Sequence, residues 1–337
     1  MAASPPTSFR IRDLTISPNV VLAPMEGVTD LYFRRVIRRI GGVGYTCTEF
    51  VPAKGLSLKG KRVLQTCSFD PDERPIVIQI YGREPEQMAR AGRIVQDLGA
   101  TIVDINMGCP SKKVCAHSGG SALMKDPGLV RDIVRAVRSA VDLPLTVKMR
   151  SGFDAGRRNA PEIAWICQEE GAEAVTIHWR TREDRYGGQR AVDKIAETKA
   201  RLSVPVLANG DIIDVPSALA MLRDTGADGL MIGRGAIRNP WLGLQITQAL
   251  RGDPVVSPSA AARRQALFFY FGQIRAAFHS DKGALGRMKM VSNHFTRALP
   301  DAEELRTRVL RSQSPDQAQA LLAAFFDDLE AAEALAA

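Results

Sequence analysis

Short apolar runs rich in Val, Ile and Leu recur along the chain as far as Gly235, and each ends on a polar residue or a glycine. The segments between them carry helical stripes, with apolar residues every three or four positions, at 88–98 and at 129–137. Near-continuous apolar strands that alternate with amphipathic helices predict a parallel sheet covered by helices. The expected strands are 20–23, 45–48, 76–78, 102–105, 145–147, 174–177, 204–208 and 229–232.

The number and spacing of these runs predict the architecture. The strand ends recur at intervals of about 30 residues, the size of a strand with its return helix. Eight such units favour closure into a (β/α)8 TIM barrel of the α/β class. A doubly wound open sheet is the alternative, and the lack of a GxGxxG motif after an early strand disfavours it.

The pattern changes after the last expected strand. A helical stretch leads into a segment marked by Pro254 and Pro258. From Ala260 onward only helix-forming stretches remain, such as those at 262–278, 286–299 and 314–334. We therefore expect two domains: a barrel over 1–255 and a C-terminal all-α helical bundle over 256–337.

Composition is that of an ordinary globular chain, with 45% apolar and 24% charged residues. The N-terminal residues lack the apolar core of a signal peptide, and no run approaches membrane-spanning length, so we expect a cytoplasmic protein without a membrane partner. Five cysteines, without a CxxC pair, argue against a disulfide framework or a zinc module. Cys109, Cys115 and His117 lack a fourth ligand at suitable spacing, so we expect no metal.

The stretch 101–125 carries the most specific chemistry. An apolar strand there ends at Asn106, Gly108 and Cys109, then continues through Lys112 and Lys113 to a pair of glycines. A buried strand that finishes on an amide and a thiol is typical of a strand end facing a ligand. The alternative is a small buried cysteine in a tight turn, because free Cys behaves as a compact apolar residue.

The other strand ends supply a coherent set of groups, and barrel enzymes build their sites at these ends. Glycines at ANGDI and IGRGAI, after the seventh and eighth strands, fit a phosphate site, although Gly210 and Gly233 could serve only tight turns. Lys148 ends an apolar strand, where it needs an anionic or electron-rich partner unless it reaches solvent. The full set of candidates at strand ends is Gln79, Asn106, Cys109, Lys148, His178, Arg180, Asn209 and Arg234.

Basic residues crowd the expected barrel mouth, and the net charge is +8. Their concentration at the mouth indicates that a nucleic-acid backbone binds there. Charges scattered over the protein would indicate only a solvated surface. The residues of the mouth are Lys112, Lys113, Arg157, Arg158, Arg180, Arg182, Arg185 and Arg190, and Arg287, Lys289, Arg297, Arg306, Arg308 and Arg311 continue them in the helical domain.

Several motifs together resemble a known family. In chain order, APMEGVTD, CTEFV, VIQIYG, INMGCPSKKV, GGSALMKDP, VKMRSGFD, IHWRTRE, ANGDI and MIGRGAIRNPWL resemble the motifs of the tRNA-dihydrouridine synthases. The GCP motif with the downstream GG and KDP is specific, and the pattern is nearest to the bacterial B-type and C-type members. GALGRMKM and SPDQA resemble the helical domain of the family more loosely.

The resemblance implies an FMN enzyme that reduces uridine in tRNA to dihydrouridine with NADPH. Cys109 would donate the proton to C5, hydride from reduced FMN would reach C6, and Asn106 would bind the uracil. Lys112, Lys113 and Arg180 would contact the RNA. The flavin would be held by Pro24, Met25, Glu26, Gln79, Lys148, His178, Asn209, Gly210, Asp211, Gly233 and Arg234.

Two further hypotheses stay open at this point. The barrel could reduce a small pyrimidine, as a dihydroorotate dehydrogenase-like enzyme does, or it could be an inactive barrel that binds RNA. Ribosomal RNA is a further substrate to consider, and we expect a monomer. Trp179 departs from the family, which commonly has Gly after this histidine, so it puts the details of the phosphate side in doubt rather than the reaction.

Overall fold

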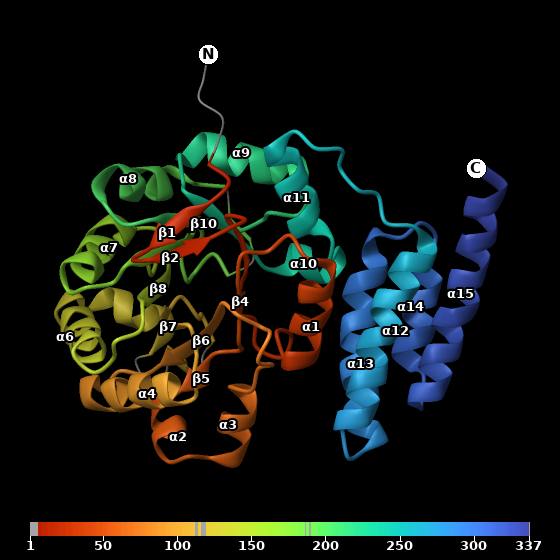
Figure 1. Ribbon diagram of the computed structural model, residues 1–337, viewed down its shortest axis with the longest axis horizontal. Coiled ribbons are helices and arrows are strands. Elements are labelled where there is room, and N and C mark those ends of the chain that lie inside the picture. Colours follow the sequence, from red (N-terminus) through yellow and green to blue (C-terminus); the bar gives the residue numbers. More distant parts are fainter. Residues whose placement is uncertain (1–5, 112–113, 116–118, 186, 189, 337) are drawn as a thin grey trace.

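A computed structural model describes residues 6–111, 114–115, 119–185, 187–188 and 190–336. Over this part of the chain, eight parallel strands form the predicted barrel, in the order β3-β11-β10-β9-β8-β7-β6-β4 (Figure 1). Their bounds are β3 Val20–Leu22, β4 Thr46–Cys47, β6 Ile76–Tyr81, β7 Ile102–Met107, β8 Leu145–Arg150, β9 Ala174–His178, β10 Val206–Asn209 and β11 Gly229–Ile232. The predicted fold class is confirmed.

The barrel closes between β3 and β4, the two strands at the ends of this order. The Leu22 N–H donates to the Tyr45 carbonyl (3.1 Å), and the Gly44 N–H donates to the Val20 carbonyl (2.8 Å). These bonds join β3 to the segment that leads into β4, so the sheet has no open edge there. A short strand β5, Val51–Pro52, extends the pairing of β6.

Helices surround the barrel and bury the stripes expected from the sequence (Figure 1). On the helix over 127–138, for example, Val130, Ile133, Val134 and Val137 are fully buried. The long helices are α1 Leu31–Ile40, α4 Pro85–Asp97, α6 Pro127–Arg138, α7 Ala160–Glu169, α8 Asp193–Arg201, α9 Val215–Thr225 and α11 Leu242–Arg251. Shorter ones are α2 Ala53–Ser57, α3 Lys61–Thr66, η1 Gly120–Lys125 and α10 Arg234–Arg238.

A hairpin that the sequence pattern did not predict covers one end of the barrel. Strands β1 Phe9–Ile11 and β2 Leu14–Ile16 pair in antiparallel fashion. Phe9, Ile11 and Ile16 pack against apolar residues that the barrel strands point inward, among them Val77 and Leu207. This end is therefore an apolar plug, which leaves the opposite end for a ligand.

Several strands run further than the sequence pattern indicated. Gln79 lies inside β6, Asn106 inside β7 and Lys148 inside β8, so these residues do not follow the strand ends. Register places Asn106 beside Lys148 on neighbouring strands. The half of the barrel interior away from the hairpin is therefore lined with polar side chains, which made the strands look shorter than they are.

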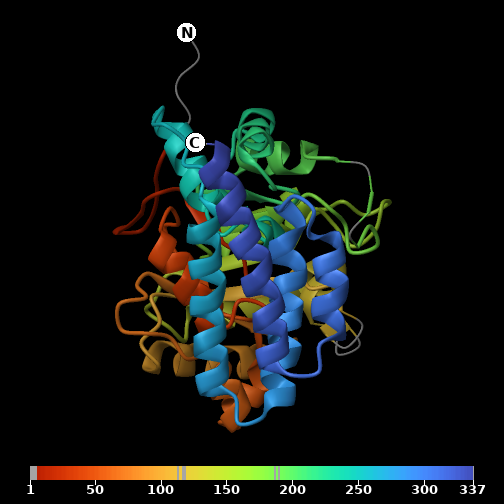
Figure 2. The same ribbon diagram turned by 90° about the vertical axis from the view of Figure 1, so that its right-hand side faces the viewer.

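The C-terminal helices form a bundle beside the barrel. They are α12 Ala260–Ala277, α13 Asp281–Phe295, η2 Thr296–Ala298, α14 Ala302–Arg311 and α15 Pro315–Ala336, and Figure 2 shows the long ones side by side. Against α1, Tyr270 packs its ring edge on Phe33, and the Arg35 guanidinium donates to Gln273 (3.0 Å). No described helix is long and apolar enough to cross a membrane.

Candidate active site

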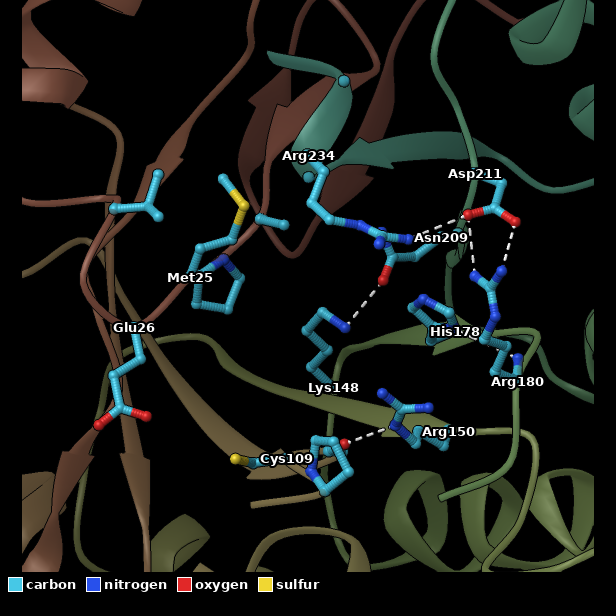
Figure 3. Close-up of a pocket in the computed structure, with 18 of the residues that line it drawn as sticks. Met25, Glu26, Cys109, Lys148, Arg150, His178, Arg180, Asn209, Asp211 and Arg234 are labelled. Atoms are coloured by element: carbon cyan, nitrogen blue, oxygen red, sulfur yellow. Dashed lines mark hydrogen bonds and ion pairs between the residues drawn. The ribbon is translucent and has the colours of Figure 1, made fainter. Parts of the chain in front are cut away.

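A cavity of about 1190 Å³ opens at the end of the barrel opposite the hairpin (Figure 3). Pockets for drug-sized ligands usually measure about 300–1,000 Å³, so this one has room for a cofactor together with part of a substrate. Its walls come from the ends of β3, β7, β8, β9, β10 and β11 and from His294 of the helical domain. Both domains therefore contribute to one site.

One end of the cavity presents a thiol, and we call Asn106, Gly108 and Cys109 the thiol end. The Asn106 Oδ1 accepts hydrogen bonds from the backbone N–H groups of Gly108 (3.0 Å) and Cys109 (2.9 Å). The Arg150 Nε donates to the Gly108 carbonyl (2.8 Å). Burial is the main cause that raises the pKa of Cys109 above its usual value, so the group is a thiol at neutral pH.

A buried polar layer lies beneath the thiol end. The Asn106 Nδ2 donates to the Gln79 Oε1 (2.7 Å), and the Gln79 Nε2 donates to an oxygen of Asp104 (2.6 Å). The Thr146 hydroxyl donates to the other oxygen of Asp104 (2.5 Å). Burial raises the pKa of Asp104 to about 6, with these hydrogen bonds and Lys148 acting in the opposite direction.

The centre of the cavity is occupied by the side chain of Lys148, which does not reach out to solvent as one interpretation of the sequence suggested. Its Nζ donates to the Asn209 Oδ1 (2.9 Å), and the Asn209 Nδ2 donates to the Met231 carbonyl (2.6 Å). Burial, followed by the charge of Arg150, lowers the pKa of Lys148 to about 8. The ammonium group is thus held in place and keeps its proton at neutral pH, but loses it at a lower pH than an exposed lysine does.

His178 is a neutral donor in this arrangement. Burial first, and then the charges of Lys148 and Arg150, lower its pKa well below the usual 6.5. The backbone N–H of Arg180 donates to the His178 Nδ1 (3.1 Å). A neutral imidazole that accepts at Nδ1 carries its proton on Nε2, so His178 offers an N–H to a ligand.

We call the far side of the cavity the cationic end. It carries Arg180, Asp211 and Arg234 with the neutral His178, and Lys148 reaches it from the centre of the cavity through its bond to Asn209. The Arg180 guanidinium binds both oxygens of Asp211 (2.8 and 2.6 Å), and its Nε donates to the Gly187 carbonyl (2.6 Å). The Arg234 Nη2 also donates to Asp211 (3.2 Å). Figure 3 shows the two guanidinium groups meeting at this one carboxylate.

Trp179 explains part of this geometry. Its side chain is 1% exposed, and the Arg180 guanidinium carbon lies 4.0 Å from the ring centroid. A Cβ added to Gly210, where φ is +114°, would lie 2.6 Å from the Trp179 Cδ1. Trp179 therefore fills the space beside the Gly210 backbone, and its ring lies against the Arg180 guanidinium.

The loop after β3 forms the remaining wall. Pro24, Met25 and Glu26 line the cavity. The Thr29 hydroxyl accepts from the Met25 N–H (2.9 Å), and the Glu49 carboxylate accepts from the Gly27 N–H (2.7 Å). These bonds fix the loop at the rim.

Most residues singled out in the sequence meet at this cavity. Gln79 lies one layer deeper, with a fully buried side chain. Lys112, Lys113 and His117 lie outside the described residues. Among the residues that the structure describes, no group of three His, Cys, Asp or Glu side chains could hold a metal ion. The residues that line the cavity are Pro24, Met25, Glu26, Asn106, Cys109, Lys148, His178, Arg180, Asn209, Gly210, Asp211, Gly233 and Arg234.

Asp104, Arg150 and Glu49 were missed as members of the site. A usable signal was present, because polar residues alternate with apolar ones along β7 and β8, at Asp104 and Asn106 and at Thr146, Lys148 and Arg150. Alternate residues of a strand share one face, so each polar series had to point into the barrel together.

Comparison with known proteins decides the family. The family model described as dihydrouridine synthase (Dus) matches residues 21–330. The chain belongs to the dihydrouridine synthase family. The matched range begins on β3 and ends in α15, so this family assignment covers both the barrel and the helical domain.

Similar proteins in the family carry more specific names. The chain is 39% identical over 325 residues to "tRNA-dihydrouridine synthase B" of Xanthomonas campestris, covering 95% of this chain and 96% of the relative. It is 36% identical over 326 residues to "tRNA-dihydrouridine synthase B" of Pseudomonas putida, covering 96% and 95%. These relatives match this dihydrouridine synthase along almost its whole length.

Solved structures confirm the fold at much lower sequence identity. A variant of NCR from Zymomonas mobilis is 14% identical, with a TM-score of 0.52, covering 77% of this chain and 95% of that one. Morphinone reductase in complex with tetrahydroNAD is 14% identical, with a TM-score of 0.50, covering 76% and 93%. At this distance the likeness concerns the fold of the dihydrouridine synthase alone.

Proposed function

We propose that this chain reduces the C5=C6 bond of uridines in tRNA to 5,6-dihydrouridine, with FMN as its cofactor and NADPH as the reductant. One observation carries the proposal: the protonated thiol of Cys109 faces the same cavity as the charged groups Lys148 and Arg234. Membership of the dihydrouridine synthase family and the names of its relatives give the reaction and the RNA class.

The residues present fit a flavin nucleotide. Lys148 places a cation near the centre of the cavity, where an electron-rich ring edge would be stabilised, and Pro24, Met25 and Glu26 would line the ring. A Cβ on Gly233 would lie 3.7 Å from the Met25 Sδ, so the Gly233 backbone lies beside the loop that would line the ring. FMN reduced by NADPH would supply the hydride for C6 when bound here.

The phosphate of the cofactor would lie at the cationic end. Arg234 would supply positive charge to the phosphate, and His178 would donate an uncharged N–H to it. The Gly210 and Gly233 backbone, which carries no side chain, would let the phosphate approach closely. Asn209 and Asp211 would hold the ribityl chain and the arginines. Gln79 lies below the cavity floor, so its expected contact with the flavin stays a prediction.

Cys109 would act as the general acid. Burial keeps its proton on the sulfur at neutral pH, and that proton passes to C5 as the carbon–carbon double bond is reduced. Asn106 fixes the backbone of the cysteine and would hold the uracil. The thiolate left behind is reprotonated from solvent before the next turnover.

A uridine of folded RNA must leave its stack to reach this cavity. We propose residues 1–255 as the catalytic domain and 256–337 as the tRNA-binding domain, with Arg180, Lys112 and Lys113 on the RNA side. Arg180 is 4% exposed and bonded to Asp211, which supports a role in shaping the mouth as well. Both lysines lie outside the described residues.

The decisive test is mass-spectrometric detection of dihydrouridine after purified protein, NADPH and unmodified tRNA are incubated together. We expect product from wild type and from the matched control Cys115→Ser, which alters the other cysteine of this loop. Cys109→Ala should make little or none. Absence of product from a yellow, NADPH-oxidising wild type would contradict tRNA as the substrate and direct the search to ribosomal RNA or small pyrimidines.

The RNA-facing lysines have a separate test. Charge reversal of Lys112 and Lys113 to Glu should weaken tRNA binding more than it slows NADPH oxidation. Charge reversal of Arg90 and Arg93, exposed on α4, is the matched control and should change binding less. Equal damage to binding and NADPH oxidation by the lysine variants would count against an RNA-facing loop.

A further inference from the structure

Asp104 has no role in the reaction described above, yet it is a carboxylate buried inside the barrel. Its side chain lies on β7 and the residue is 5% exposed. Burial raises its pKa to about 6, so at neutral pH the folded chain encloses a charge that would be better solvated outside. A group kept at such a position, directly beneath a cavity, is a candidate for a functional role.

The hydrogen bonds around Asp104 form a chain with one direction. It starts at the backbone N–H groups of Gly108 and Cys109, which can only donate, so they require the oxygen of Asn106 to face them. The Asn106 Nδ2 must then face the Gln79 oxygen. The Gln79 Nε2 in turn must face an acceptor, and Asp104 is that acceptor.

We propose that Asp104 is a positioning residue, the terminal acceptor of a hydrogen-bond chain that sets the direction of the Gln79 and Asn106 amides and thereby holds Cys109 at the cavity. The kinetic part of this inference rests on the proposed function. The structural part, that Asp104 controls the setting of the Cys109 thiol, does not.

The chain also decides what Asn106 offers to a ligand. Its oxygen accepts two backbone N–H groups and one of its N–H bonds points to Gln79. The second N–H remains at a residue that lines the cavity. The thiol end therefore offers the second N–H of Asn106, a donor that suits a carbonyl oxygen of a pyrimidine. If the Asn106 amide were turned the other way, it would offer an acceptor instead.

Two substitutions remove the Asp104 acceptor to different degrees. Asp104→Leu replaces both oxygens with methyl groups and keeps the branched shape of the side chain, leaving the Gln79 N–H without an acceptor. Asp104→Asn keeps one oxygen, and rotation of the Thr146 hydroxyl lets that oxygen continue to accept from Gln79. The matched control is Asp97→Asn, the same chemical change in an exposed carboxylate on α4, outside the cavity.

Three measurements separate positioning from general stability. The first is the split between kcat and KM for tRNA. The second is the rate at which iodoacetamide alkylates Cys109 in the holoenzyme without substrate, followed by peptide mass spectrometry. The third is alkylation of the buried Cys167, which reports unfolding in the same sample.

We expect kcat to fall about tenfold or more in Asp104→Leu, less in Asp104→Asn, and KM for tRNA to change less than kcat. Cys109 should alkylate severalfold faster in the same order, because its loop is released. Cys167 should stay protected, and the thermal midpoint of Asp104→Asn at pH 7 should not fall, since a buried charge has been removed. Asp97→Asn should behave as wild type.

Wild-type kcat and wild-type Cys109 alkylation in a folded Asp104→Leu variant would overturn the proposal. If that variant exposes Cys167, the same two measurements on Asp104→Ala decide, because this change also removes both oxygens and adds no bulk, and wild-type values for both overturn the proposal. Should wild type make no dihydrouridine, the proposed function fails, whereas the alkylation contrast still tests the positioning role by itself.

Discussion

The thiol end and the cationic end face each other across one cavity but are held by different kinds of interaction. At the thiol end, the Asn106 and Gln79 amides and backbone N–H groups hold Cys109, with the Asp104 carboxylate beneath them and Arg150 on the Gly108 carbonyl. Charged groups hold the opposite end, where Arg180 and Arg234 share Asp211. The thiol end depends on the direction in which each amide points, whereas the cationic end depends on the balance of its charges.

Burial nevertheless acts on both ends in the same way, because it favours the uncharged form of every group. For the acid Cys109 it raises the pKa, and for the bases Lys148 and His178 it lowers the pKa. One physical cause thus gives a thiol that keeps its proton and an imidazole that stays neutral in the same cavity. This combination suits proton donation beside an anionic cofactor.

The largest effect should come from breaking the thiol end alone. Cys109→Ala should lower the rate of dihydrouridine formation by about 10²–10⁴-fold, the usual contribution of a general acid. Because the cationic end is untouched, the purified variant should keep the flavin absorbance of wild type. Loss of the flavin together with activity would show that the two ends are not separable.

Titration of the cationic end should give the next largest effect. Activity should fall as pH rises through about 8, where Lys148 loses its proton. The free energy of unfolding should show the opposite trend, because between pH 8 and 10.5 the unfolded chain binds the proton that the folded chain has released. Rate profiles and denaturant titrations across this range measure both.

Lys148→Met is the control for this assignment. Its residual activity should be low and should lack the fall near pH 8, and its unfolding free energy should lose the rise between pH 8 and 10.5. A fall in rate with pH that persists unchanged in this variant would assign the titration to another group.

A smaller effect is expected from the backbone that supports the cationic end. Gly210→Ala should lower the free energy of unfolding by about 1–3 kcal/mol, because φ at this residue is +114° and the added Cβ would overlap the Trp179 ring. Gly272→Ala is the matched control: Gly272 lies inside α12 with open space around it, so stability should hold or rise.

Pairing Gly210→Ala with Trp179→Ala sharpens the test of the indole. If the ring is the obstacle, the losses of unfolding free energy in the double variant should be less than additive. Additive losses would mean that backbone strain alone requires glycine and that Trp179 acts only on Arg180.

The smallest effect should come from the junction between the domains, away from both ends. Arg287 pairs with Asp30 at 3.5 Å, in a setting that is partly open to solvent. Arg287→Ala should therefore lower the free energy of unfolding by about 1 kcal/mol or less in a denaturant titration. Lys282→Ala, an exposed change on the same helix, should have no effect, and a loss well above that of ordinary surface pairs would show that this contact ties the domains together.

The sequence pattern predicted the eight barrel strands and the helical bundle because Val- and Ile-rich runs alternate with amphipathic stretches. It placed the ends of β6, β7 and β8 too early, since Gln79, Asn106 and Lys148 looked like residues beyond a strand. A barrel can bury polar side chains inside its own strands when neighbouring strands supply partners, and a single strand does not reveal those partners.

The hairpin β1–β2 was not predicted, and helix α14 was not singled out within the predicted bundle, for related reasons. Each hairpin strand is only three residues long, and its apolar residues gain their burial from the floor of a barrel formed by distant strands. Helix α14 is mostly polar and buries Ala302, Leu305 and Val309 against its neighbours in the bundle. Local patterning is weak where burial comes entirely from distant partners.

The sequence by itself determined the order of strands and helices and the chemical groups available at the barrel mouth, because both follow from local periodicity and residue type. Only the tertiary structure decided which groups meet: Gln79 with Asp104, Lys148 with Asn209, and Arg180 with Asp211. These contacts join separate strands, and they depend on register and on closure of the barrel. The pKa values of Cys109, Lys148 and His178 follow from the same closure, because burial is a property of the assembled fold.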